Sequence, residues 1–252
     1  MQRVIAIANQ KGGVGKTTTA INVGALLAKS GKTVLLIDLD PQANMTSGIG
    51  LNKNNQKTIQ DVLFNADEIR HAIIETEFDN LSIVPARPEL ATAEVDLVNE
   101  LAREQRLKQA LAKTEFDYVL IDCPPALGLL TINALTAADD VLIPVQAEYF
   151  AMEGLGQLLH TVQRIRQALN PQLNLLGVLL TMYDTRTTLS EQVKDELMQH
   201  LPDKVFNAII PRNVRLAEAP SHGKPVHEHD RWSKGAKAYK QLVKEIEKTL
   251  KK

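Results

Sequence analysis

The stretch Asn9-Gln10-Lys11-Gly12-Gly13-Val14-Gly15-Lys16-Thr17-Thr18 decides the fold of this chain. It follows a short apolar run, Val4–Ala8, and leads into a helical pattern at Thr17–Ser30. A glycine-rich turn between a strand and a helix is the setting that a phosphate-binding loop requires. The glycines let the backbone turn tightly and aim amide groups at an anion, and the helix N-terminus adds its positive end. We therefore expect a phosphate-binding loop over residues 9–18.

Two lysines and two threonines give this loop its chemistry. Lys16 supplies a positive charge for the β- and γ-phosphates of a nucleotide, and the Thr17 hydroxyl is placed to ligate Mg²⁺. The usual pattern, G-x-x-x-x-G-K-[ST], would put its first glycine at position 10, where Gln10 stands, and a second lysine, Lys11, follows. The predicted nucleotide-binding residues of the loop are Lys11, Gly12, Gly13, Val14, Gly15, Lys16, Thr17 and Thr18.

Short apolar runs alternate with helical patterns along the rest of the chain. The runs are largely continuous and rich in β-branched residues, as strands are when helices cover both faces of a sheet. Strands are predicted at Val4–Ala8, Thr33–Ile37, Leu81–Val84, Tyr118–Ile121, Val141–Val145 and Leu175–Leu180, and helices at Thr17–Ser30, Glu89–Lys113, Met152–Leu169, Leu189–His200 and Ser233–Lys252. This alternation predicts an α/β fold, a single doubly wound, mostly parallel sheet flanked by helices, and one domain over residues 1–252.

Composition excludes several classes of protein. The chain has 252 residues, of which 44% are hydrophobic and 23% charged, so it is neither a disordered chain nor a collagen-like repeat. One cysteine, Cys123, excludes an internal disulfide and any site that needs several thiolates from one chain, and we expect its side chain to be buried. No apolar run reaches the ~20 residues of a membrane span, and the first residues lack the features of a signal peptide. These features predict a cytoplasmic protein.

Two predicted strands end in aspartates. Asp38 and Asp40 follow the strand Thr33–Ile37, and Asp122 follows the strand Tyr118–Ile121. The carboxyl ends of parallel strands face the same crevice as the phosphate-binding loop. A carboxylate there can hold a metal-bound water or orient an attacking water, although an isolated aspartate after a strand is as often a turn or helix cap. Together with the loop, the two aspartate positions favour a nucleotide-hydrolysing site.

Four segments together resemble the ParA/Soj family of chromosome- and plasmid-partitioning ATPases. They are KGGVGKTT at 11–18, DLDPQANMTSG at 38–48, DYVLIDCPPALGLLTINAL at 117–135 and IPRNVRLAEAPSHGKP at 210–225. The likeness extends over nearly the whole chain, and this family shares with MinD a second lysine at the start of the loop. The resemblance implies a P-loop NTPase fold, hydrolysis of ATP with Mg²⁺, and an ATP-dependent homodimer in which Lys11 reaches the nucleotide of the partner.

The resemblance also implies roles for individual residues. Lys11, Lys16 and Asp40 would be catalytic, with Asp40 positioning the attacking water, while Thr17 would bind Mg²⁺ directly and Asp122 through a water. Asp38 would contact other residues of the site rather than the nucleotide or Mg²⁺. The adenine would lie against Met182, Pro211, Arg212 and Asn213, with Thr181 nearby. The residues themselves favour ATP over GTP, because Thr181-Met182-Tyr183-Asp184 stands where a GTPase would show Asn-Lys-x-Asp.

Charge is distributed unevenly along the chain. Residues 201–252 carry 12 Lys+Arg against 6 Asp+Glu, whereas residues 1–200 carry 17 against 24. A basic C-terminal fifth without a helix-turn-helix pattern suits sequence-independent binding of double-stranded DNA, although solvated surface lysines would look the same. The resemblance implies that Arg186 and Arg215 face the DNA, that the protein associates with the nucleoid, and that a ParB-like DNA-binding protein stimulates slow hydrolysis.

Other readings of the same features stay open. The alternative function is a MinD-like membrane-associated positioning ATPase, and a metabolic or electron-transfer enzyme on the same loop is a further rival. The apolar stripe of the last helix, Ser233–Lys252, suits packing on its own domain better than a membrane surface. The cluster His222, His227 and His229 is expected to lie in an exposed loop rather than to bind a metal.

Overall fold

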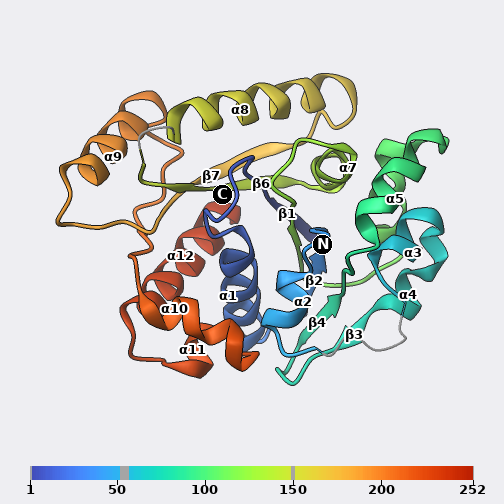
Figure 1. Ribbon diagram of the computed structural model, residues 1–252, viewed down its shortest axis with the longest axis horizontal. Coiled ribbons are helices and arrows are strands. Elements are labelled where there is room, and N and C mark those ends of the chain that lie inside the picture. The colour runs from blue at the N-terminus through green and yellow to red at the C-terminus, as the bar shows by residue number, and fades with distance from the viewer. Residues whose placement is uncertain (1, 52–56, 149–150, 252) are drawn as a thin grey trace.

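A seven-stranded sheet forms the centre of the computed structural model, which describes residues 2–51, 57–148 and 151–251 (Figure 1). The strand order is β3-β4-β2-β5-β1-β6-β7, and every pairing is parallel except that of β3 with β4. The strands are β1 (Arg3–Ile7), β2 (Val34–Asp38), β3 (Ile74–Glu75), β4 (Leu81–Val84), β5 (Tyr118–Asp122), β6 (Asp140–Gln146) and β7 (Asn174–Thr181). The predicted sheet and its six strands are confirmed; β3 is too short to leave a pattern in the sequence.

Helices cover both faces of the sheet (Figure 1). One face carries α1 (Lys16–Lys29), α2 (Asn44–Gly48), α10 (Val214–Glu218), α11 (Val226–His229) and α12 (Lys234–Leu250). The other carries α3 (Ile59–Phe64), α4 (Ile69–Ala72), α5 (Leu90–Asp96), α6 (Arg106–Leu111), α7 (Leu129–Ala137), α8 (Ala151–Ala168) and α9 (Thr188–His200). Alternate residues of each central strand supply the two cores, which is why the strands read as continuous apolar runs.

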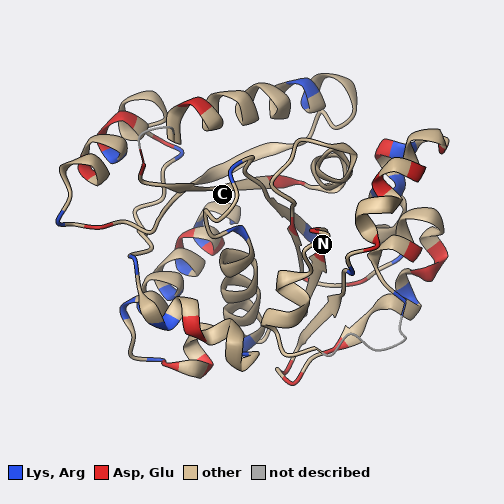
Figure 2. Cartoon of the chain, in the orientation of Figure 1, with Lys and Arg blue, Asp and Glu red and all other residues tan. Residues whose placement is uncertain are grey.

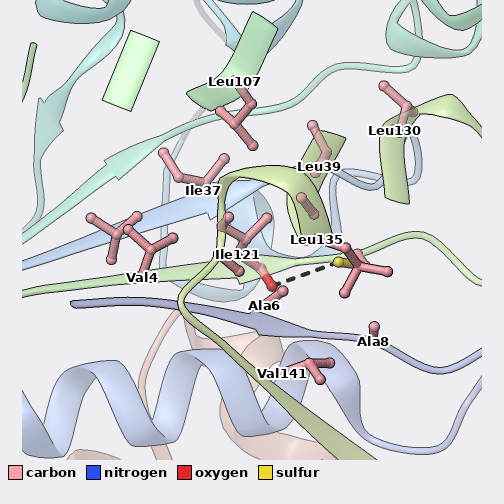
Figure 3. Packing of buried hydrophobic residues seen from close by; sticks show 14 of the residues in the cluster. Val4, Ala6, Ala8, Ile37, Leu39, Leu107, Ile121, Leu130, Leu135 and Val141 are labelled. Carbon is pink, nitrogen blue, oxygen red and sulfur yellow. Dashed lines mark hydrogen bonds between the residues drawn. The ribbon is translucent and has the colours of Figure 1, made fainter. Parts of the chain in front are cut away.

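The core on the α7 side shows how this packing works (Figure 3). Leu107 of α6 and Leu135 of α7 pack in one cluster with Ile37 of β2, Leu39 just after β2, and Ile121 of β5. All five residues are buried. Cys123 lies in the same core, fully buried, with its Sγ 4.0 Å from the carbonyl oxygen of Ile121. Burial raises the pKa of the Cys123 thiol. The predicted buried cysteine is confirmed, and it is held in its unreactive thiol form.

The last helix packs on its own domain, as predicted. Tyr239, Leu242 and Ile246 of α12 are buried against the sheet face that α1 covers, and the Tyr239 hydroxyl lies 3.1 Å from the hydroxyl of Thr19 in α1. The described helix ends at Leu250, and residue 252 of the prediction lies outside the described residues. Among the described helices, none combines the length and apolarity that crossing a bilayer would require.

The single long helix predicted over Glu89–Lys113 was wrong. The segment contains α5, two short 3₁₀ turns at Leu97–Asn99 and Arg103–Gln105, and α6. The chain bends because Glu100 is extended and Ala102 has a φ of 51°, and the Arg106 guanidinium donates to the carbonyl of Leu101 at 2.9 Å. Residues of both halves pack into one core, Leu90 and Leu97 from the first and Leu107 from the second.

The histidine segment is only partly the exposed loop that we expected: His222 is exposed, but His227 and His229 lie on α11 and are partly buried. His222 ends a 3₁₀ turn at Ala219–His222, and its ring stacks on His229 of α11 with 4.8 Å between centroids. The side chain of His227 is only 9% exposed, and burial lowers its pKa. Within the described residues, no group of three or more His, Cys, Asp or Glu side chains is arranged to hold a metal ion.

Candidate active site

The loop over residues 9–18 joins β1 to α1 at the carboxyl edge of the sheet. Gly13 and Gly15 have φ angles of 74° and 88°, a left-handed conformation that glycine adopts without steric cost. Gly15 is also the N-cap of α1, and among the described residues no side chain caps the first amides of that helix. The first amide groups of α1 are therefore left to an anion, and the helix dipole favours a negative charge there.

Two side chains fix the loop in place. The amide of Asn9 donates to the carbonyl of Pro144 at 2.6 Å, and its oxygen accepts the backbone N–H of Lys11 at 3.0 Å. At the other end, the hydroxyl of Thr181 donates to the carbonyl of Val14 at 2.8 Å. These bonds tie the loop to β6 and β7 before any ligand binds, so the loop is pre-organised for its anion.

Lys16 and Lys11 occupy different environments. The Lys16 side chain lies inside the loop, where its ammonium donates to the carbonyl of Lys11 at 3.2 Å, and burial lowers its pKa. The Lys11 side chain is 43% exposed, and its ammonium pairs with the carboxylate of Glu148. A phosphate would stabilise a buried ammonium whose partner is a neutral carbonyl, because it supplies an opposite charge. An exposed ammonium at the rim is accessible to another molecule.

Glu148 and Thr46 are site residues that sequence reasoning missed. Glu148 lies two residues beyond the end of β6, and its second oxygen accepts the side-chain amide of Gln146. Glu148 thus repeats the pattern that identified Asp38 and Asp122, a carboxylate just after a strand, and that pattern could have revealed it. Thr46 donates its backbone N–H and its hydroxyl to Asp38 at 2.8 and 2.6 Å, a contact that nothing in the sequence marks.

The aspartates of β2 and β5 lie side by side, as the parallel sheet predicted. Asp38 is the register partner of Asp122, which also pairs in register with Ile7 of β1. Both aspartates are fully buried. Burial raises the pKa of Asp38 to about 6 against its hydrogen bonds to Thr46. Burial and the charge of Asp38 raise the pKa of Asp122 well above its ordinary value, and Thr17 and Lys16 oppose that shift.

Asp122 is the carboxylate that most needs a ligand. Neither of its oxygens has a well-aligned hydrogen-bond partner in the described part of the chain, although the Thr17 hydroxyl is close enough to act on the carboxylate. A buried carboxylate without partners is costly, and a divalent cation or its bound water removes that cost. Mg²⁺ commonly takes one or two protein oxygens and completes its shell with phosphates and water. The Thr17 hydroxyl and the Asp122 carboxylate therefore fit Mg²⁺ beside a bound polyphosphate.

Asp40 lies at the start of a tight turn beside the loop. The residue is 7% exposed, and its side chain accepts the backbone N–H of Gln42 at 3.0 Å, while its carbonyl accepts the N–H of Ala43 at 2.8 Å. Ala43 has a φ of 53°, a left-handed backbone that is uncommon for alanine. The negative charge of Asp40 favours the charged form of Lys16 and so opposes the lowering of its pKa by burial. The structure therefore brings Asp40 to the phosphate end of the loop.

The residues predicted to border the adenine come together at the end of β7. The N–H of Tyr183 donates to Ile210 and the N–H of Arg212 donates to Tyr183, both at 3.1 Å, so residues 181–184 run beside residues 210–213. Met182 has a φ of 50°, a strained conformation of the kind that often marks binding sites. Asn213 caps α10 by accepting the N–H of Arg215 at 3.0 Å. Met182, Pro211, Arg212 and Asn213 therefore share one edge of the site.

Arg186 and Arg215 follow these two segments and are exposed. Arg186 forms a two-pronged ion pair with Asp184 at 2.9 and 2.6 Å, which lowers the pKa of that carboxyl. Arg215 pairs with Glu218 at 2.9 Å and with Asp230 at 3.4 Å. Exposed ion pairs contribute only about 0–1 kcal/mol, so phosphate groups can compete for both guanidinium groups.

Comparison with known proteins gives consistent results. A family model described as an AAA domain matches residues 2–175. The sporulation initiation inhibitor protein Soj of Bacillus subtilis is 54% identical over 249 residues, covering 98% of each chain. The chromosome partitioning protein ParA of Caulobacter vibrioides is 51% identical, covering 97% of this chain and 93% of that protein.

Solved structures agree on fold and ligand. Cobyrinic acid a,c-diamide synthase from Mycobacterium smegmatis, with bound ADP and magnesium, is 40% identical with a TM-score of 0.87 and covers 100% of this chain and 96% of that one. The same enzyme has been solved with an ATP analogue and magnesium. The septum site-determining protein MinD of Pyrococcus horikoshii, complexed with Mg-ADP, is 28% identical with a TM-score of 0.79, covering 99% of this chain and 98% of that one.

Proposed function

Since this chain belongs to the ParA/Soj family of partitioning ATPases, we propose that it is a DNA-partitioning switch in which ATP joins two copies on DNA. It is an ATPase that uses ATP and Mg²⁺. One observation carries the switch: the same loop holds one lysine inside, Lys16, and presents a second, Lys11, at its exposed rim. A monomer needs only the inner lysine to bind phosphates, which leaves the outer one for a second copy.

Within one copy, we assign the hydrolytic roles to residues 9–18, Asp40 and Asp122. Lys16 and the first amides of α1 would bind the β- and γ-phosphates, and the Thr17 hydroxyl and Asp122 would hold Mg²⁺, with Asp122 acting through a water. Mg²⁺ bound there supplies positive charge that offsets the charge of the phosphates. Asp40 would accept a hydrogen bond from the attacking water and hold it in line with the γ-phosphate. The residues Met182, Pro211, Arg212 and Asn213 would border the adenine.

The dimer would depend on the γ-phosphate. Lys11 of each copy would leave Glu148 and reach the phosphates of the nucleotide in the other copy, which makes ATP part of the interface. ADP lacks the γ-phosphate charge, so hydrolysis would loosen the dimer and set its lifetime. Residues 1–252 would act in this cycle as one ATPase domain.

DNA binding would follow dimerisation. Arg186 and Arg215 follow the two segments that run side by side at the end of β7, and we assign both to one DNA-facing surface. Their contacts with phosphates would be independent of sequence and sensitive to salt, because bound counterions are released. A single copy offers few contacts, and a dimer doubles them, so the affinity for double-stranded DNA would rise steeply on dimerisation. Binding of this kind would place the protein on the nucleoid.

Hydrolysis in this cycle would be slow without help. The phosphate-binding loop, residues 9–18, contains no arginine. An arginine that contacts the transferred phosphate can raise the rate of hydrolysis by roughly 10³–10⁵. We therefore propose that a ParB-like DNA-binding protein stimulates hydrolysis. The alternative, a MinD-like ATPase on a membrane, is disfavoured because the apolar stripe of α12 is buried in the domain and is not available to lipid.

One titration tests the switch. Affinity for a plasmid fragment is measured with ATP, ADP and no nucleotide at two salt concentrations, and the dimer fraction is followed by light scattering. We expect dimers and tight, salt-sensitive DNA binding with ATP alone. Equal DNA binding in all three states, or ATP-dependent binding to lipid vesicles without DNA binding, would contradict the proposal.

A further inference from the structure

A groove of about 710 Å³ runs between the C-terminal part of α1 and α12. Leu26 of α1 and Ala236 and Val243 of α12 form its apolar floor, and Trp232 stands at one end. The groove is remote from the phosphate-binding loop, because Lys16 and Lys29 are at opposite ends of α1, about 20 Å apart at the helical rise. It therefore lies apart from the nucleotide site.

The charged side chains that line this groove are mostly basic, Lys29, Arg231, Lys237, Lys240 and Lys244, with one carboxylate, Glu247, among them. Lys29 is neutralised by Glu228 at 2.6 Å. Lys237, Lys240 and Lys244 are exposed, and within the described residues no carboxylate pairs with any of them. Their spacing of three and four residues sets them along one side of α12 over about 10 Å. Figure 2 shows basic residues following the length of this helix.

Trp232 and Arg231 lie together among the residues that line the groove. Trp232 is 70% exposed, and the guanidinium of Arg231 lies 4.9 Å from its ring centroid. Tryptophan and arginine are the residues most enriched where binding energy is concentrated in protein interfaces. His227, which also lines the groove, is 9% exposed on its side chain, and its Nδ1 has no hydrogen-bond partner in the described chain.

We propose that this groove binds an acidic amphipathic helix of a partner protein. The occupant would lay an apolar stripe on Leu26, Val243 and Trp232 and pair its carboxylates with the lysines of α12. The phosphates of duplex DNA could pair with the lysines, but duplex DNA has no apolar surface that would pack on the apolar floor of the groove. A bilayer is too flat to reach a floor set between two helices. About two helical turns of such a segment match the length of the lysine row.

Trp232 is the single tryptophan of the chain, so its fluorescence reports directly on the groove. The full-length protein is titrated with a synthetic helical peptide of about 12 residues that carries one leucine face flanked by glutamates. We expect a saturable blue shift, as the indole is covered. A peptide with each glutamate replaced by lysine should give none. Lys237→Glu combined with Lys240→Glu should weaken binding at least tenfold.

A matched control makes the same charge change at the C-terminal end of α12 and just beyond it. Lys248→Glu with Lys251→Glu lies outside the groove lining and should leave the affinity for the acidic peptide unchanged, and circular dichroism confirms that each variant is folded. The proposal is overturned if the acidic peptide gives no shift, if the lysine peptide binds equally well, or if both double variants weaken binding equally. A shift given only by duplex DNA or by anionic vesicles would overturn it too, and would assign the groove to phosphates.

Discussion

Lys11 and Glu148 form an ion pair within one chain, at the rim of the phosphate-binding loop. Gln146 holds the second oxygen of Glu148, so the carboxylate is fixed in place. The lysine that we assign to the partner's nucleotide is thus already neutralised in the single chain. In the proposed dimer, a phosphate group from the second copy has to displace this carboxylate.

Replacing Glu148 should therefore favour the dimer. An exposed ion pair of this kind contributes about 0.2–1 kcal/mol, so Glu148→Gln should lower the ATP concentration for half-maximal dimerisation by up to about fivefold. Light scattering across an ATP titration measures this. A lower dimer fraction in Glu148→Gln would show instead that the carboxylate positions Lys11 for its partner.

Substitution of the two lysines of the loop should cause different defects. Lys16→Ala removes a buried ammonium from the phosphate site, and we expect at least about tenfold weaker ATP binding, since a hydrogen bond to a charged group contributes about 1.5–3 kcal/mol. Lys11→Ala should bind ATP nearly normally and yet remain monomeric. Calorimetry for binding and light scattering for mass separate the two, and an ATP-dependent dimer of Lys11→Ala would refute the assignment.

Asp40→Ala should separate ATP binding from hydrolysis. The side chain lies beside the loop without ligating the phosphates in our assignment, so ATP binding and dimerisation should persist. Loss of the group that orients the water should slow hydrolysis by about 10²–10⁴. Phosphate release and dissociation from DNA are measured together, and the variant should stay on DNA. Normal turnover would exclude Asp40 as the residue that positions the water.

Arg215→Glu should lose DNA binding but keep the ATP-dependent dimer. The change places a negative charge beside Glu218 and Asp230, so phosphates are repelled where they were attracted. We expect at least about tenfold weaker binding and a shallower dependence of affinity on salt. Arg164→Glu, an exposed arginine of α8 on the other side of the sheet, is the matched control. Equal losses in both variants would point to net charge rather than to this surface.

Asp38 should make the ligand-free protein sensitive to pH. Burial raises its pKa to about 6, above its value of about 4 in an unfolded chain. The folded state then binds the proton more tightly, so this contribution to stability is complete below pH 4 and is lost as the pH rises through 6. Relative to Asp38→Asn, the wild type should gain stability between pH 7 and pH 5 in urea unfolding. The exposed control Asp79→Asn should follow the wild type, and identical pH profiles for Asp38→Asn and wild type would contradict the assignment.

Local sequence determined the parallel sheet and most of the loop chemistry. Runs such as Leu35–Ile37 are apolar at every position because both faces of the sheet are covered, and Gly13 and Gly15 stand where the backbone is left-handed. The aspartates that end β2 and β5 could be placed at one edge because parallel strands end together. Such features depend on the residue and its near neighbours, so they can be read from one sequence.

Only the tertiary structure decided which distant residues share an environment. The pairing of Lys11 with Glu148, the hydrogen bonds from Thr46 to Asp38 and the meeting of residues 181–184 with 210–213 all join segments that the chain separates. The break at Glu100–Ala102 likewise lies among residues of good helix propensity, so no local pattern marks it. Burial sets the pKa of Asp38 and Asp122, and burial is a property of the whole packed chain, which no local pattern records.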